Sequence, residues 1–479
     1  MIDDGKYELF VGGEFVPAEG SETITTTNPA TEERLAEVPA GTAGDVDRAV
    51  ATATDALDDW RLLDPAERGR LLHALADAIR DERDRLARIE TLDNGKPLSQ
   101  ARRDVDGAAR YFEYYAGVAD KVQGESIPLS AEYVDYTLRE PLGVTGQIIP
   151  WNLPINILGR SVAPALASGN VSVVKPAEQT PLTALEVARL ADDVGFPPGV
   201  LNVVTGYGPE AGAALAGHPD LDGISFTGSV PTGREVGTAA VENITHVHLE
   251  LGGKSPNVVF PDADLEAALD GTVTGIFATN AGQVCSAGSR LLVHEDVHAE
   301  FVDRLAGRAA DLTVGPGIED PDVGPLVSAE QFEKVTRYLD VGREEAGEPV
   351  VGGEALDRPG YFVEPTVFDD VANEARIAQE EIFGPVLSVI PFADETEAFE
   401  LANAVDYGLV AGIFTSDVGR AHRFAREVEA GQVYVNEWFA GGVETPFGGR
   451  KRSGFGREKG LEAIDSYTTT KNVCLRIDR

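Results

Sequence analysis

The sequence contains very little cysteine and little lysine. Its 479 residues include 2 cysteines, and lysine accounts for only 9 of the 40 basic residues. So few cysteines exclude a small secreted fold held together by disulfides and favour a reduced, cytoplasmic protein. Long apolar runs are also missing, since none approaches the ~20 residues that span a bilayer. The first residues, Met-Ile-Asp-Asp-Gly, lack the basic and apolar segments of a signal peptide. We therefore expect a cytoplasmic protein that does not bind membranes.

Basic residues are outnumbered two to one. Eighty acidic residues face 40 basic ones, which gives a formal net charge of −40. This balance argues against binding to nucleic acid or to anionic membranes, because both need a basic surface. The acids are spread along the chain, as in proteins of halophiles, whose like-charge repulsion is screened by concentrated salt. We predict a halophilic source, and an ordinary acidic enzyme is the alternative.

The length predicts at least two domains, because single hydrophobic cores stop growing near ~250–300 residues. From about residue 143, short β-branched runs alternate with segments of helical length. The predicted strands are Val144–Ile149, Val171–Val174, Val200–Val204, Gly223–Phe226 and Val247–Leu251, with helices over 155–167, 181–194, 209–216 and 231–240. Such alternation is typical of a parallel sheet with helices on both faces, whose ligands bind at the carboxyl ends of the strands.

A second alternating series follows the first. Its predicted strands are Asn257–Phe260, Leu291–His294, Val386–Ile390, Val410–Phe414 and Gln432–Val435, with helices over 296–310 and 417–428. We therefore expect an α/β protein with two doubly wound domains, one of residues 1–120 and 143–251 and one of residues 252–466. Residues 121–142 and 467–479 read as strands outside both domains. They could form an arm that pairs with another subunit, so we expect a homodimer or homotetramer.

A glycine turn in the first series is typical of a phosphate site. Gly228 and Ser229 lie between Phe226, in a predicted strand, and Pro231, which suits the first turn of a helix. Free backbone N–H groups and the positive end of the helix dipole would favour an anion there. A plain strand-to-helix turn is an equally good interpretation of this segment alone.

Two further turns of the first series are weaker signals. Lys175 and Glu178 follow a predicted strand and could hold nucleotide hydroxyls, although a solvated loop explains an isolated pair better. Gly208 lies in a Gly-rich turn whose spacing misses the dinucleotide pattern G-x-G-x-x-G by one residue.

Two residues are candidates for chemistry. Cys285 lies among small residues in Asn-Ala-Gly-Gln-Val-Cys-Ser-Ala-Gly-Ser, which leaves room for a substrate. A lone cysteine is more often a small buried hydrophobe, and Cys474 in the apolar tail is our example of that interpretation. Glu250 ends a predicted strand before Gly252 and Gly253 and could act as a general base near a nucleophile. An ion-paired structural acid is the alternative.

Histidine spacing could suggest a metal, but we predict none. His246 and His248 alternate on a strand and so share a face, and His294-Glu-Asp-Val-His298 matches the zinc protease pattern H-E-x-x-H. That pattern must lie within one helix for its histidines to share a face. Here Arg290–Val293 reads as a strand and Glu295 as the turn that follows, which separates the two histidines.

In this order and spacing, the segments together resemble the NAD(P)-dependent aldehyde dehydrogenase superfamily over essentially the full length. The matching segments are Asn28–Thr31, Pro150–Pro154, Lys175–Glu178, Gly199–Gly206, Phe226–Ser229, Glu250–Ser255, Gly282–Cys285, Glu381–Pro385, Pro446–Gly449 and Ser453–Arg457. The resemblance implies a Rossmann-like NAD-binding domain in the first series and a catalytic domain in the second. It also implies NAD as cofactor, with NADP possible, and a small-molecule aldehyde as substrate.

The resemblance assigns roles to single residues. Cys285 matches the nucleophile, Asn152 the side-chain amide of the oxyanion hole and Glu250 the general base. The matched cofactor contacts are Lys175 and Glu178 at the adenosine ribose, Ser229 at the pyrophosphate in the turn with Gly228, Glu381 at the nicotinamide ribose and Phe383 beside the nicotinamide, with Gly208 and Phe226 in neighbouring segments. One departure is Ala278, since the family usually has Phe there; it touches packing around the nucleophile loop.

The implied reaction is oxidation of an aldehyde to its acid. The thiolate attacks the aldehyde, hydride leaves to the nicotinamide, and water hydrolyses the thioester. Relatives that transfer the acyl group to coenzyme A lack the glutamate, so Glu250 favours hydrolysis. The alternative is a catalytically inactive protein that keeps this fold for a binding or structural role.

The substrate remains open at this stage. By offset from the matched segments, the tunnel should include Leu153, Ile157, Arg160, Trp438 and Phe447. The aromatic residues suit an apolar or cationic aldehyde, whereas Arg160 suits a carboxylate, as in succinate-semialdehyde dehydrogenases, which carry Arg at this position. Alternatively, Arg160 turns away and pairs with one of the many surface acids.

Overall fold

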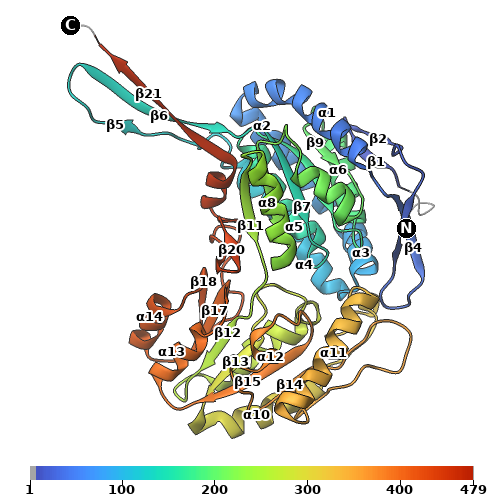
Figure 1. Cartoon of the computed structure of the whole chain (residues 1–479), viewed down its shortest axis with the longest axis vertical. Coiled ribbons are helices and arrows are strands. Elements are labelled where there is room, and N and C mark those ends of the chain that lie inside the picture. The colour runs from blue at the N-terminus through green and yellow to red at the C-terminus, as the bar shows by residue number, and fades with distance from the viewer. Residues whose placement is uncertain (1–6, 478–479) are drawn as a thin grey trace.

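A computed structural model describes residues 7–477, and it contains two open sheets in separate lobes and a projecting arm (Figure 1). Residues 1–6 and 478–479, which the predicted first domain and arm include, lie outside the described residues. Within residues 7–477, no helix is both long and apolar enough to cross a membrane.

The first sheet has eight strands, and its five central strands are parallel. In spatial order the strands are β2 (Glu14–Val16), β1 (Leu9–Val11), β9 (Leu201–Val203), β8 (Val171–Pro176), β7 (Val144–Ile149), β10 (Gly223–Thr227), β11 (His246–Glu250) and β20 (Gly454–Phe455). The five central strands are those predicted from the sequence, which confirms the first alternating series. The outer strands β1 and β20 run antiparallel to their neighbours.

Helices of the first half cover this sheet. They are α1 (Ala43–Leu62), α2 (Pro65–Asp81), α3 (Arg83–Asn94), α4 (Leu98–Ala116), α5 (Pro154–Ala167), α6 (Leu182–Asp193), the π-helical turn η1 (Gly208–Gly212), α7 (Ala213–Ala216) and α8 (Val230–Glu242). The predicted start of α2 is confirmed, because the Asp64 carboxylate accepts a hydrogen bond from Ala66 N at 2.8 Å and Pro65 occupies the first helical position.

The second sheet has six parallel strands. Their order is β14 (Thr366–Phe368), β15 (Val386–Phe392), β13 (Arg290–His294), β12 (Pro256–Val259), β17 (Val410–Phe414) and β18 (Gln432–Val435), and the helices are α9 (Leu265–Val273), α10 (Glu295–Ala310), α11 (Ala329–Ala346), α12 (Arg376–Gln379), α13 (Glu395–Asn403) and α14 (Val418–Glu427). The prediction found five of these strands. It missed β14, a three-residue strand too short to show a period.

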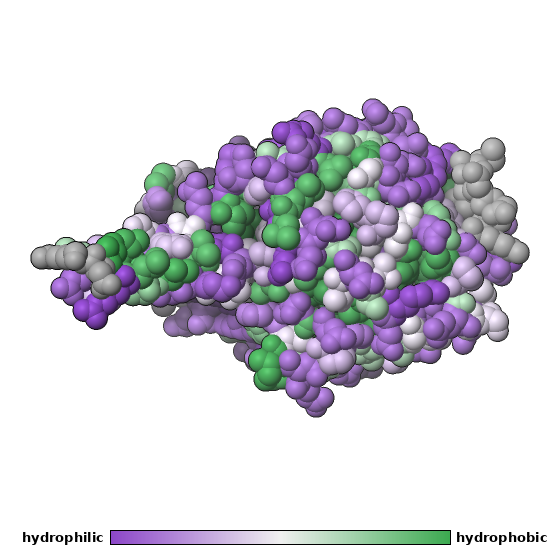
Figure 2. Space-filling view, turned by 90° about the horizontal axis from the view of Figure 1, so that it is seen from above, coloured by the Kyte–Doolittle hydropathy of each residue, from purple (hydrophilic) through white to green (hydrophobic). Residues whose placement is uncertain are grey.

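A three-stranded antiparallel sheet forms the arm. Strand β6 (Tyr133–Pro141) pairs along its whole length with β21 (Thr468–Arg476), and β5 (Ser126–Ile127) pairs with β6 on the other side. The arm projects from the upper lobe in Figure 1, and Figure 2 shows apolar surface along it. Exposed apolar side chains here include Leu129, Val134, Leu138, Leu475 and Ile477. The two predicted segments therefore do come together outside both large sheets.

Smaller elements complete the described structure. Strands β3 (Thr23–Thr27) and β4 (Arg34–Pro39) form a hairpin, β16 (Tyr407–Gly408) pairs with β19 (Arg450–Lys451), and single turns of helix are η2 (Thr274–Ala278), η3 (Asn280–Gly282), η4 (Gly317–Glu319) and η5 (Glu462–Tyr467).

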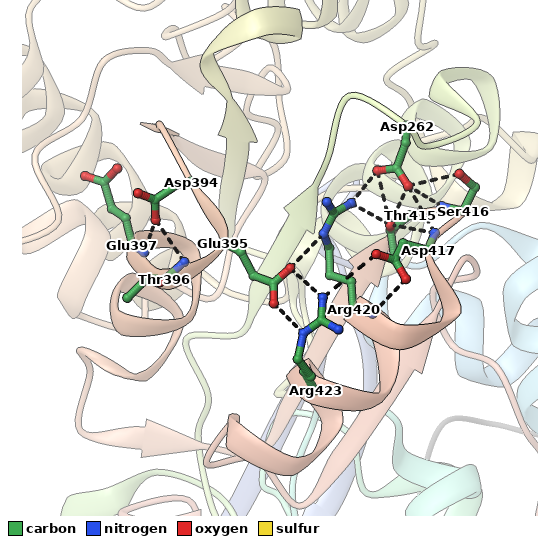
Figure 3. A network of polar contacts seen from close by, with 10 residues as sticks. All are labelled: Asp262, Asp394, Glu395, Thr396, Glu397, Thr415, Ser416, Asp417, Arg420 and Arg423. Atoms are coloured by element: carbon green, nitrogen blue, oxygen red, sulfur yellow. Dashed lines mark hydrogen bonds and ion pairs between the residues drawn. The ribbon is translucent and has the colours of Figure 1, made fainter.

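A network of acids and arginines connects the loop after β12 with α13 and α14 (Figure 3). The Asp262 carboxylate accepts hydrogen bonds from Thr415, Ser416 and Asp417 N, and Arg420 Nη1 donates to it at 2.6 Å. Arg420 also pairs with Glu395, at 3.1 Å, and its guanidinium lies 4.1 Å from the centre of the Phe260 ring. The Asp262 carboxylate is thus surrounded by donors, and these contacts outweigh partial burial and lower its pKa.

Candidate active site

A cavity of about 180 Å³ lies where the carboxyl ends of β7, β10 and β11 face the second lobe. It is lined by Pro150, Trp151, Asn152, Thr227, Gly228, Ser229, Glu250, Leu251, Gly252, Cys285, Gln331, Lys334, Glu381 and Phe383. Seven of the residues singled out in the sequence therefore meet in one cavity. This position agrees with the general rule for ligands of parallel sheets.

Cys285 reaches the cavity from the loop that follows the strained turn η3. Asn280, Ala281 and Gly282 have φ values of 48°, 51° and 74°, a left-handed run that disfavours non-glycine residues. A Cβ at Gly282 would lie 2.3 Å from Gly384 O, so only glycine fits there. Burial and the nearby Glu250 raise the pKa of Cys285 to about 12, against the opposing effect of Arg160. The loop thus places an uncharged thiol in the cavity wall.

Asn152 lies in the connection between β7 and α5 and is buried. Its side-chain Nδ2 donates to Gln283 O at 3.0 Å, two residues before the cysteine. Its own carbonyl accepts from the Asn280 side chain at 2.8 Å, so the two loops are tied together in both directions. An amide nitrogen carries two hydrogens, and the second is left for a group bound beside Cys285.

Glu250 ends β11 with its carboxylate inside the protein, where it is 2% exposed. Among the described residues, neither carboxylate oxygen has a hydrogen-bond partner. Burial raises the pKa of Glu250 to about 7, and the neighbouring His248 opposes this rise. A carboxyl group with such a pKa can both accept and release a proton near neutral pH.

The strand that carries Glu250 is fixed by a segment about two hundred residues later. Gly454 lies opposite Glu250 in the pairing of β20 with β11. The Ser453 hydroxyl donates to Gly252 O at 2.7 Å across 201 residues, and Leu251 N donates to Ser453 O at 3.0 Å. The matched segment Ser453–Arg457 therefore belongs to the framework of this site.

Glu381 and Phe383 enter the cavity from the loop between α12 and β15. Gly253 N donates to Glu381 Oε1 at 2.9 Å, and burial raises the pKa of this carboxyl group. The Phe383 ring stands edge-on to Trp151, with 5.2 Å between the ring centres. Sequence reasoning missed Gln331, whose side chain donates to Phe383 O at 2.7 Å. It also missed Lys334. Gln331 and Lys334 both lie on α11, where no sequence motif around them indicates a binding site.

Of the remaining predicted cofactor contacts, Gly228 and Ser229 line this cavity, whereas Lys175, Glu178, Gly208 and Phe226 do not. Ser229 caps α8, accepting from Thr232 N at 3.4 Å, and a Cβ at Gly228 would lie 2.5 Å from the Phe226 ring. Phe226 therefore packs against the glycine turn and does not line the cavity. Lys175 Nζ and Glu178 Oε2 pair at 3.1 Å at the carboxyl end of β8. The helical turn that begins at Gly208 approaches this pair, since a Cβ at Gly212 would lie 3.7 Å from the Lys175 side chain.

None of the predicted tunnel residues is part of this cavity wall. Trp438 and Phe447 are buried in a cluster against which Cys285 packs. Leu153 and Ile157 pack in the core of the first lobe. Their role as tunnel residues stays a prediction.

Arg160 corrects one expectation. It does not pair with a surface acid: its side chain is 7% exposed and forms an ion pair with Glu458, whose side chain is 2% exposed. The guanidinium also lies 5.2 Å from the centre of the Phe447 ring. Burial is the largest single influence and lowers the pKa of Arg160, but Glu458 together with Tyr111, Cys285 and Glu250 outweighs burial and raises it. The charge of Arg160 is therefore matched inside the protein.

The histidine pattern is divided as the sequence indicated. His294 ends β13 and its Nδ1 accepts from Asp296 N at 3.2 Å, as a cap of α10. His298 lies within α10 and contacts Asp369 at 2.8 Å instead. The two histidines therefore do not share the helical face that the zinc protease pattern requires.

Comparison with known proteins agrees with this geometry. The model of the aldehyde dehydrogenase family matches residues 15–473. The chain is 47% identical to hydroxyisobutyraldehyde dehydrogenase of Mycolicibacterium austroafricanum, covering 98% of this chain and 94% of that protein. It is 46% identical to mitochondrial aldehyde dehydrogenase of Equus caballus, covering 98% and 95%. An aldehyde dehydrogenase of Bacillus cereus, solved in complex with NAD+, superposes with a TM-score of 0.97 at 45% identity, covering 99% of this chain and 97% of that one. The chain belongs to the aldehyde dehydrogenase family.

Proposed function

We propose that this protein oxidises an aldehyde to the carboxylic acid with NAD as the hydride acceptor. The observation that carries the proposal is the convergence of Cys285, Asn152 and Glu250 on one cavity, with Ser229 and Glu381 in the same wall. The relatives described above include dehydrogenases of aldehydes and one that binds NAD+. An inactive protein kept for binding would have no need for this combination of thiol, amide and unpaired carboxylate.

The residues present fit a dinucleotide. The N-terminus of α8 offers free backbone N–H groups beside Gly228, where the helix dipole favours a pyrophosphate. Lys175 and Glu178 provide a donor and an acceptor for ribose hydroxyls, and Glu381 provides an acceptor inside the cavity. When bound, NAD supplies the acceptor for the hydride that leaves the substrate carbon.

The protein residues carry the remaining chemistry. Loss of the Cys285 thiol proton creates the nucleophile, whose attack on the aldehyde gives a thiohemiacetal. The free hydrogen of Asn152 Nδ2 and the Cys285 backbone N–H stabilise its oxyanion; one such donor contributes about 3–4 kcal/mol. After oxidation to the thioester, Glu250 removes a proton from water, which attacks the acyl carbon and releases the acid.

We further propose NAD over NADP. The Glu178 carboxylate lies beside Lys175, and a negative charge there would repel a 2′-phosphate. A comparison of kcat/KM for the two cofactors, in the wild type and in Glu178→Gln, tests this. A higher value with NADP in the wild type would contradict the preference.

The division of the chain is also a proposal. Residues 1–120 and 143–251 would form the NAD-binding domain, residues 252–466 the catalytic domain, and residues 121–142 and 467–479 an arm for a homodimer or homotetramer. The apolar side chains exposed along β6 and β21 support the last assignment, since a second subunit would bury them. Sedimentation of the full chain and of Leu138→Glu tests it.

The direct experiment is NADH formation, followed at 340 nm, over a panel of aliphatic, aromatic, amino and acid-semialdehyde substrates at low and molar KCl. We expect the wild type to form NADH and Cys285→Ala to form none. A wild type that binds no NAD and oxidises no aldehyde of the panel would refute the proposed function.

A further inference from the structure

A buried histidine lies between the candidate active site and a separate surface groove. His248, on β11, is 4% exposed, and its Nε2 has no hydrogen-bond partner among the described residues. This nitrogen is 3.7 Å from Glu250 Oε1, whose carboxylate is also without a partner. The two groups lie on the same face of the strand, since they are two residues apart. Approach by about 0.5–1 Å would form a hydrogen bond between them.

The other ring nitrogen of His248 is held in place. Nδ1 lies 3.2 Å from the Ser225 hydroxyl on the neighbouring strand β10. A hydroxyl can donate or accept, so this contact is compatible with both neutral tautomers of the ring. One tautomer presents N–H to Glu250, and the other presents a lone pair that can take a proton from it.

The groove lies beside the ring of His248. It measures about 480 Å³ and is lined by His246, Val247, His248, Gly456, Arg457, Glu462, Asp465 and Ser466. The ring packs directly on Gly456: a Cβ there would lie 2.0 Å from His248 Cδ2 and 2.8 Å from Nε2. The edge of the ring that carries Nε2 thus lies near both Glu250 and Gly456, a residue of the groove wall. His246 and His248 both line it, which confirms that they share a face.

We propose that His248 is a positioning residue for Glu250 and passes its proton to solvent in this groove. The proposal rests on the proposed function and adds a route by which the Glu250 proton reaches solvent. In thioester hydrolysis, water forms the new C–O bond and gives one proton to Glu250, while the C–S bond breaks and its electron pair goes to Cys285 Sγ. The Glu250 proton then moves to His248 Nε2 and from there to water in the groove, which returns Glu250 to its basic form.

The charges around His248 set the direction of a pH effect. Glu250 and His246 share its strand, Arg457 follows β20, and Glu462 and Asp465 lie on η5. Glu458 lies near enough to Glu250 to raise its pKa, whereas His248 lowers it. Removing the imidazole should therefore raise the pKa of Glu250 and move the acid limb of the kcat profile to higher pH.

The test uses His248→Ala in the full-length enzyme, with His246→Ala as the matched control on the same groove. We expect an unchanged first-turnover burst of NADH, a fall in steady-state kcat of about tenfold or more, and an acid limb at higher pH. Added imidazole should restore kcat, because the open groove admits it to the space left by the ring. His246→Ala should leave all three measurements unchanged.

Several results would overturn this inference without touching the proposed function. In one, the wild type oxidises aldehydes and His248→Ala keeps the same kcat and pH profile. In another, His248→Ala loses the burst of NADH and the steady-state kcat equally. In the third, added imidazole does not restore the kcat that His248→Ala has lost. If His248→Ala does not fold, His248→Gln replaces it, because the glutamine side chain fills the space of the ring. The same burst and pH profile are then measured on His248→Gln. The proposed function fails separately, when the wild type itself forms no NADH.

Discussion

The carboxylates of Glu250 and Asp262 are held in opposite ways. Glu250 is buried with no hydrogen-bond donor among the described residues, and its pKa rises to about 7. Asp262 is partly exposed, accepts hydrogen bonds from three successive residues and an arginine, and has a lowered pKa. A buried carboxylate without a partner lowers the free energy of unfolding, whereas a carboxylate surrounded by hydrogen-bond donors raises it. The difference separates acids kept for chemistry from acids kept for structure, and five experiments can break or sharpen it.

The largest expected effect is on Cys285. Cys285→Ala should lower aldehyde oxidation at least ~10⁴-fold, because no other group in the cavity wall can form the thiohemiacetal. NAD binding, measured by calorimetry or fluorescence, should stay within a few-fold of the wild type. Cys474→Ala is the matched control, since Cys474 is exposed on the arm and should leave activity unchanged. Activity of Cys285→Ala within tenfold of the wild type would contradict its role.

Glu250→Gln should lower steady-state turnover by about 10²–10⁴-fold, the usual contribution of a general base. The first-turnover burst of NADH should remain, because the base is needed after the thioester has formed. Rapid mixing at 340 nm separates the two phases. If the burst disappears together with turnover, Glu250 instead takes the proton of the Cys285 thiol.

The buried pair of Arg160 and Glu458 gives the third effect. Glu458→Gln should lower the free energy of unfolding by about 3–5 kcal/mol, since it leaves a buried guanidinium without a counter-charge. Denaturant unfolding measures this, and the double variant Arg160→Met with Glu458→Gln should recover much of the loss. Because the guanidinium already pairs with Glu458, we expect Arg160→Leu to raise KM no more for an acid semialdehyde than for a neutral aldehyde of equal length. A variant Arg160→Leu that raises KM only for acid semialdehydes would show otherwise.

Neutralising the two compared acids should change stability in opposite directions. At pH 8, Glu250→Gln should raise the free energy of unfolding by about 1–3 kcal/mol, because the native carboxylate is held against a pKa raised above its unfolded value. That gain should shrink as pH falls through about 7 and be mostly gone near pH 4, where the carboxyl group is largely protonated in both states. Asp262→Asn should lower stability by about 1–2 kcal/mol at pH 8, and its effect should shrink as pH falls through the lowered pKa. Melting curves at the two pH values read both effects, and equal signs at pH 8 would remove the distinction.

Salt should have the smallest effect on stability per residue, because it acts on all surface charges at once. The Debye length falls from ~10 Å at 0.1 M to ~3 Å at 1 M, which screens repulsion at a net charge of −40. We expect the melting temperature to rise by roughly 5 °C or more in molar KCl. The Asp262 network should weaken slightly in the same salt. A constant melting temperature would leave the acidic composition unexplained and remove the reason to infer a halophilic source.

The sequence predicted the regular parts of the fold because their period is local. Val144–Ile149 is a strand over the predicted range, and Asp64 caps a helix at Pro65, since both signals lie within a few residues. The short strand β14 has no such signal. The pairing of β20 with β11 could not be predicted either, because the position of this two-residue strand depends on contacts with residues about two hundred positions away.

The site was predicted through resemblance more than through residue chemistry. Cys285 and Glu250 were each ambiguous alone, and only their order among the other segments suggested that they meet. Gln331 and Lys334 were missed, since nothing near them on α11 marks a site. The partner of Arg160 was also out of reach, because Glu458 is one of 80 acids and burial alone distinguishes it.

The closure of the first sheet by β20 bears on how the protein is made. Glu250 is synthesised near the middle of the chain, but the residues that fix its strand, from Ser453 to Phe455, follow about two hundred residues later. At ~5–20 residues per second, a ribosome takes about 10–40 s to supply them. During that time β11 has a free edge, and Glu250, the proposed general base, has no fixed position. Catalytic competence can therefore arise only when synthesis is nearly complete, and a chain released early would expose a strand edge prone to aggregation.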